Sequence, residues 1–128
     1  MIYTDGIMMI EPSGAPSEEP LIDEVTRKMT AAWRTNRASQ VEYRKPHICS
    51  CGAESDRYDH WIVEGATGRF TNSLCIHYLA YHRQDVPESE LAKVMVLNYG
   101  HEEPTRMELV KPIPRRVIRE VGRNVRGG

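Results

Sequence analysis

The sequence predicts one small α+β domain with tails. Its 128 residues, 40% of them hydrophobic, are enough to bury a modest core. Apolar residues recur at helical spacing over 19–36, and short segments rich in strand-forming residues flank the glycines of 65–68. All three cysteines and four of the five histidines fall between positions 47 and 82, which concentrates the reactive side chains in the middle of the chain.

The first third of the chain predicts a hairpin, a linker, a helix and a weak strand. Residues 1–10 place an Asp-Gly turn signal between apolar pairs, which is typical of a tight hairpin. Residues 11–20 carry three prolines and a glycine, so we interpret them as a linker, with Ser17 as a candidate helix cap. The helix is expected over 19–36 and the strand over 40–44.

The remainder predicts two strands followed by helices. Strands are expected over 57–63 and 69–71, and a helix capped near 71–73 and ending near 83. Pro87 suits the start of another helix, and Thr105 with Glu108 matches a capping box. A last, basic helix is expected from about 117. We therefore divide the chain into 1–45 (hairpin, linker and helix), 46–110 (ββα module with the following helix) and 111–128 (basic segment).

Composition and charge exclude several classes of protein. The net charge is −1, so the whole chain is not a polycation that binds nucleic acid by bulk charge. No apolar run approaches the ~20 residues that span a bilayer, and the N-terminus lacks the pattern of a secretory signal. We expect a cytoplasmic protein with no membrane partner, and no small-molecule substrate is evident. An odd number of clustered cysteines in a reducing compartment favours metal binding over disulfides.

Six candidate zinc ligands lie within 36 residues, and zinc prefers thiolate and imidazole ligands in a tetrahedral set of four. The expected order is a cysteine turn, two strands and a helix, so two ligands come from the turn and two from the helix. The candidates are His47, Cys49, Cys51, Cys75, His77 and His82.

These residues give the segment a partial resemblance to a classical two-Cys, two-His zinc finger. Leu74, His77 and His82 match the core leucine and the histidine spacing of that family, whereas Cys-x-Cys and the 25-residue gap from Cys51 to His77 depart from its pattern. The resemblance implies a structural Zn²⁺ in a ββα module with an enlarged hairpin. The segment TNSLCIHYLAYHR also resembles a recurring segment of small uncharacterised bacterial proteins, to which no activity is attached.

Several sets of four ligands are compatible with the sequence. We prefer Cys49, Cys51, His77 and His82, although the two histidines stand about 140° apart on an ideal helix unless the helix tightens near its end. Replacing one histidine by Cys75 is the main alternative, with His47 as an outside candidate. Cys75 between two aliphatic residues also fits an ordinary buried position.

Three functions are consistent with such a module. The first is a non-catalytic interaction module for nucleic acid or protein, in which basic side chains contact the partner. The nucleic-acid candidates are Arg34, Arg37, Arg44, Lys45, Arg115, Arg116 and Arg119. Alternatively, the basic blocks 26–45 and 111–128, each with six bases and one acid (net +5), attract the acidic blocks 11–24 and 85–103 within the fold. Trp33 and Trp61 could stack on bases but suit core positions better.

The second function is an HNH-like metal-dependent nuclease. Its order of residues would be Asp59-His60 on a strand, Asn72 after a loop, and a histidine at 77 or 82 on a helix. The strand histidine would activate water and the helix histidine would bind the metal. Using that histidine for structural zinc would exclude it from catalysis. The third, redox use of Cys-x-Cys, lacks a recognisable partner pattern. We therefore expect that the protein is not an enzyme.

Overall fold

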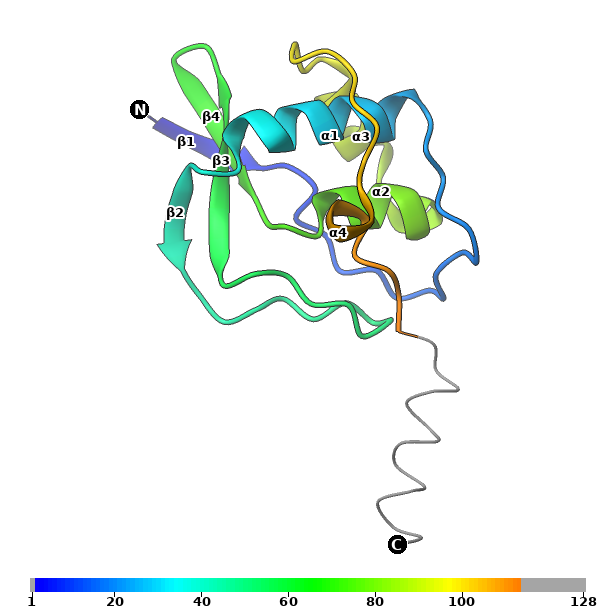
Figure 1. Cartoon of the computed structure of the whole chain (residues 1–128). Coiled ribbons are helices and arrows are strands. Elements are labelled where there is room, and N and C mark those ends of the chain that lie inside the picture. The colour runs from blue at the N-terminus through cyan, green and yellow to red at the C-terminus, as the bar shows by residue number, and fades with distance from the viewer. Residues whose placement is uncertain (1, 114–128) are drawn as a thin grey trace, which may run out of the picture.

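The computed structural model describes residues 2–113, which form a mixed sheet with helices gathered to one side of it (Figure 1). The α+β class predicted from the sequence is confirmed. The strands and helices, in chain order, are β1 (Ile2–Gly6), α1 (Glu24–Asn36), β2 (Gln40–Tyr43), β3 (Tyr58–Glu64), β4 (Thr67–Thr71), α2 (Cys75–Tyr81), the 3₁₀ turn η1 (Arg83–Asp85), α3 (Glu88–Met95) and α4 (Arg106–Leu109).

The antiparallel hairpin β3–β4 is the centre of the sheet, whose strand order is β1-β4-β3-β2. Trp61 pairs with Phe70 in the hairpin register, and the indole of Trp61 lies directly over Gly68, where even a methyl group would clash. β2 pairs antiparallel with β3 and is an edge strand. The hairpin is followed directly by α2, so the predicted order of strand, strand and helix is confirmed.

The predicted N-terminal hairpin over 1–10 is wrong. β1 pairs in parallel with β4, more than sixty residues away in sequence, instead of turning back at Asp5-Gly6. The chain continues past Gly6 into the interior, where Ile7 and Met8 are fully buried and the Ile7 N–H donates to the Phe70 carbonyl at 2.9 Å. Burial of these two apolar side chains outweighs the local turn preference.

Helix α1 begins later than predicted. Asp23, not Ser17, is the N-cap: its carboxylate accepts from the Thr26 N–H. The backbone of the preceding segment is instead held against α2, since Ser17 N–H donates to the Tyr81 carbonyl and Leu21 N–H to the Ala80 carbonyl. The end of the helix at 36 agrees with the prediction. The apolar face of α1 lies against the core.

The later helices follow their sequence signals closely. Pro87 is the N-cap residue of α3, and Thr105 with Glu108 forms the predicted capping box of α4. The expectation that Gly100 ends the helix beginning at Pro87 is wrong, because α3 ends at Met95. Among the described residues, no helix is long and apolar enough to cross a membrane. The basic helix expected from 117 lies outside the described residues.

Acidic and basic segments pair with each other across the fold. Arg27 forms an ion pair with Glu103, and Arg34 with Glu102 and Glu108. These bases belong to block 26–45. Part of block 26–45 therefore pairs with acidic side chains within the fold, as one interpretation of the charge pattern predicts. Trp33 and Trp61 are 7% and 5% exposed, so both indoles belong to the interior.

Candidate metal centre

The two turn ligands lie in a tight loop between β2 and β3. The Cys49 N–H donates to the Ala53 carbonyl at 2.8 Å, and the Gly52 N–H donates to the Cys49 carbonyl at 2.8 Å. Gly52 has φ of +92°, a conformation that favours glycine. The Ala53 N–H in turn hydrogen-bonds the Cys51 sulfur. The loop thus directs both thiols inward, where Cys49 and Cys51 are 5% and 7% exposed.

The two histidines come from the end of α2. His77 lies within the helix, which ends at Tyr81, and His82 has φ of −127° and ψ of 35°, outside helical geometry. This early end removes the 140° separation of an ideal helix and brings the two imidazole centroids to 5.1 Å. Both imidazoles are buried.

The ligand atoms of Cys49, Cys51, His77 and His82 all lie within 4.8 Å of one another. Cys49 Sγ is 3.2 Å from His82 Nε2, and Cys51 Sγ is 3.4 Å from His77 Nε2. Zn–S bonds of about 2.3 Å and Zn–N bonds of about 2.0 Å at tetrahedral angles separate S from N by about 3.5 Å. The four donors therefore fit a zinc ion after small adjustments of the side chains. Two separate thiol–imidazole contacts would not require all four donor atoms to converge.

The two histidines differ in the hydrogen bonding of Nδ1, the ring nitrogen that is not directed at the cysteine sulfurs. His77 Nδ1 lies 3.1 Å from the carbonyl of Leu109, so this nitrogen carries the proton and donates, and Nε2 presents its lone pair to the centre. His82 Nδ1 is buried and has no hydrogen-bond partner among the described residues. The Leu109 carbonyl is thus the outer partner that fixes one of the two imidazoles.

Burial favours the neutral forms of His77, His82 and Cys51 before a cation binds. Burial, assisted by the neighbouring His82, lowers the pKa of His77 to about 4. Burial also lowers the pKa of His82 and raises that of Cys51. Two neutral imidazoles are ready ligands at neutral pH, whereas a thiol must lose its proton to bind. Two thiolates would balance the charge of one divalent cation.

The other two candidate ligands lie outside this group. Cys75 is fully buried, its pKa is raised to about 12 by burial, and its side chain hydrogen-bonds Thr71. It occupies the ordinary core position that its aliphatic neighbours suggest. His47 Nε2 lies 3.9 Å from Asp59 Oδ1, and His47 is not one of the four residues whose ligand atoms converge.

The basic candidates divide into engaged and free side chains. Arg34 forms a bidentate pair with Glu108, and Arg44 pairs with Glu42 and Asp59. Arg37 and Lys45 are exposed and have no acidic partner within 2–113. The remaining candidates, Arg115, Arg116 and Arg119, lie outside the described residues.

The residues of the nuclease alternative have other partners. His60 is 2% exposed, with Nε2 2.8 Å from Asp56 Oδ2 and Nδ1 2.8 Å from the Arg37 carbonyl. The Asn72 side chain accepts from the Leu74 N–H and donates to Met9 Sδ. Both helix histidines belong to the four-donor group, so within the described chain none remains to pair with His60.

Sequence reasoning did not associate residues 109–113 with the metal centre. Besides the Leu109 carbonyl on His77, the Ile113 N–H donates to the Cys51 carbonyl at 3.2 Å, so residues 109–113 bond to a residue of each ligand pair. Backbone groups carry no residue-type signal, and nothing in the sequence could have identified them. Comparisons with family models, curated proteins and solved structures give no match to this chain.

Proposed function

We propose that this protein is a small structural-zinc module that binds a macromolecular partner and has no catalytic role of its own. The observation that carries the proposal is the convergence of Cys49, Cys51, His77 and His82 within 4.8 Å in the interior. Catalytic zinc sites keep one position open for water or substrate, whereas structural sites use four protein ligands. Four buried protein donors support the structural type.

The location of the centre supports a stabilising role. It joins the loop between β2 and β3 to the end of α2, and within that loop regular strand pairing is limited to a single bridge between Ile48 and Glu54. A metal ion that connects such a loop to a core helix contributes its binding energy to folding. The function then lies on the surface that this framework holds in place, and the partner is a nucleic acid or another protein.

The test is metal analysis of the purified full-length chain and two serine variants. We expect about one zinc per chain in the parent, since four donors make one tetrahedral site. Cys51→Ser should lose zinc and melt at a lower temperature. Cys75→Ser is the matched control, because Cys75 is also buried but lies outside the donor group.

The two variants separate the metal role from general packing. If Cys75→Ser lost zinc while Cys51→Ser kept it, the ligand assignment would be wrong. If neither the parent nor the variants bound zinc, and the parent melted identically with and without a chelator, the structural-zinc proposal would be abandoned.

A further inference from the structure

A row of aromatic rings crosses one face of the sheet, from the interior to its open edge. The ring of Trp33 lies edge-on to His60 with centroids 4.5 Å apart, His60 is 6.3 Å from Tyr58, and Tyr58 is 5.6 Å from Tyr43. Trp33 is 7% exposed, whereas Tyr43, on the edge strand β2, is 66% exposed. An exposed ring at the end of such a row offers a surface on which another flat ring can stack.

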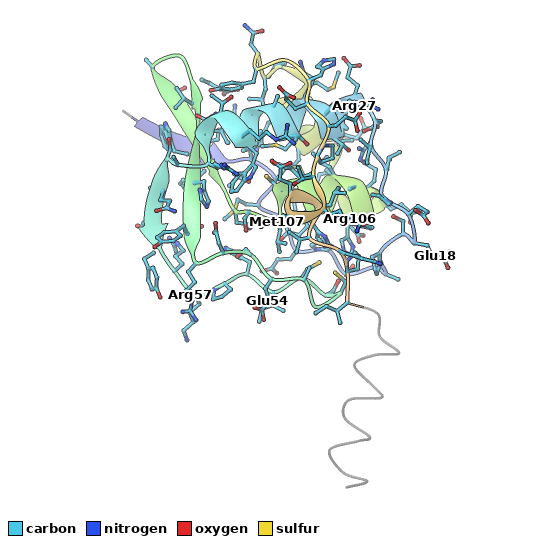
Figure 2. All side chains as sticks on the ribbon, viewed as in Figure 1. Glu18, Arg27, Glu54, Arg57, Arg106 and Met107 are labelled. Atoms are coloured by element: carbon cyan, nitrogen blue, oxygen red, sulfur yellow. The ribbon has the colours of Figure 1, made fainter. Side chains whose placement is uncertain are left out.

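The buried end of this row borders a pocket of about 450 Å³ between the sheet and α4, here called the α4 pocket. Trp33, Met107 and Val110 give it apolar walls, and Gln40 and Asp56 add polar groups. Met107 is 88% exposed. Figure 2 shows Met107 on α4 and Arg57 near the end of the sheet.

The carboxylate of Asp56 is held in a fixed orientation at the pocket. His60 Nε2 lies 2.8 Å from its Oδ2, and the Tyr58 N–H donates to its Oδ1 at 3.1 Å. The side chain is nevertheless 41% exposed. A fixed, accessible carboxylate accepts hydrogen bonds from a ligand's N–H groups, such as the amino and ring N–H groups of a nucleobase.

Three cations accompany the aromatic row without an acidic partner among residues 2–113. Arg37 lines the α4 pocket, Lys45 follows Tyr43 by two residues, and Arg57 Nη1 donates to the Tyr43 hydroxyl at 3.3 Å. The Arg57 contact holds a guanidinium beside the exposed ring. Free cations next to a stacking surface are the combination that binds the phosphates and bases of a single strand.

We propose that the aromatic row and the α4 pocket form a binding surface for single-stranded nucleic acid. One base stacks on Tyr43, a second enters the α4 pocket against Trp33, and the three free cations contact phosphates. Duplex is excluded because its bases are already stacked. This inference rests on the proposed function, since the contact of His77 with the Leu109 carbonyl anchors α4, the outer wall of the pocket.

The experiment measures the fluorescence anisotropy of a labelled 12-nucleotide single strand of mixed sequence, titrated with the zinc-loaded full-length protein. Tyr43→Ala should weaken binding by about 5- to 150-fold, as loss of one base–aromatic stack does. Tyr43→Phe keeps the ring but removes the hydroxyl that holds Arg57, so it should weaken binding by less than Tyr43→Ala does. Arg37→Gln should reduce the salt slope of log K by about 0.7, the value for one phosphate contact.

Lys28→Gln is the charge-matched control, because Lys28 lies on α1 outside the α4 pocket and has no acidic partner in the described part of the chain. It should leave affinity unchanged. All variants keep residues 114–128, so binding carried by that basic segment would persist in Tyr43→Ala and would overturn the proposal. Equal affinity for duplex would overturn it too, as would no binding by the single strand.

Zinc content measured on the same samples separates the two proposals. One zinc per chain without binding of the single strand would refute only the nucleic-acid surface and would favour a protein partner. Binding that depends on Tyr43 in a chain that holds no zinc would refute the structural-zinc module and leave the surface intact.

Discussion

Zinc binding should release about two protons per chain at pH 6, one from each thiol. His77 should release none. Burial lowers the pKa of His77 to about 4, so its imidazole is neutral in the folded protein at this pH, and burial also lowers the pKa of His82. A histidine with the ordinary pKa of about 6.5 would be about three-quarters protonated at pH 6. Two such histidines would add about 1.5 protons, for a total of about 3.5.

Isothermal titration calorimetry measures this number directly. Zinc is delivered from a weak chelator in buffers of different ionisation enthalpy, and the dependence of the observed heat on that enthalpy gives the protons released. His47→Ala is the control, since this histidine lies outside the four-donor group and should leave the count unchanged. A value near 3.5 would refute the inference that buried, neutral imidazoles face the centre.

The same pKa shifts determine the direction in which zinc affinity changes with pH. Burial raises the pKa of Cys51, so protons compete with zinc for this sulfur as the pH falls. The lowered pKa of His77 means that its imidazole does not compete until about pH 4. Zinc affinity should therefore rise with pH between 6 and 7, by about 100-fold for a two-proton release, and His77 should contribute nothing to this rise.

Three further predictions concern the centre and the packing around it. His82→Ala should lower zinc affinity by more than about 100-fold in chelator competition, whereas His47→Ala should not change it. Gly68→Ala places a Cβ 2.4 Å from the facing indole and should lower the free energy of unfolding by about 1–3 kcal/mol in urea titrations. Arg34→Ala leaves the Glu108 carboxylate, which is 8% exposed, without its bidentate partner and should lower the free energy of unfolding by about 1–2 kcal/mol. Arg27→Ala removes a more exposed ion pair and should lower it by under about 0.5 kcal/mol.

Local chemistry made much of the fold predictable. The capping box at Thr105, the helix start at Pro87 and the strands around Gly65 and Gly68 depend on residues close in sequence, and the structure contains all of them. The start of α1 was missed because Ser17 looks like a cap only locally. Its backbone is held by the end of α2, a contact between distant segments that no local pattern encodes.

The candidate metal centre was also predictable only in part. Clustering of Cys and His within 36 residues indicated which side chains to consider, and the preferred set of four is the one that converges, although the sequence left Cys75 and His47 open as alternatives. The choice depends on where α2 ends: one more helical residue would rotate His82 away from His77. The Leu109 carbonyl and the Ile113 N–H could not be anticipated, since every residue but proline offers the same backbone groups.

The parallel pairing of β1 with β4 gives the strand Ile2–Gly6 a protective role. A strand at a sheet border exposes unpaired donors and acceptors that can recruit another chain. β1 covers that border of β4, and it can do so only once the β3–β4 hairpin has formed, because its partners lie at 67–70. Removing this segment would uncover the border and invite self-association, without touching the four-donor group or the aromatic face.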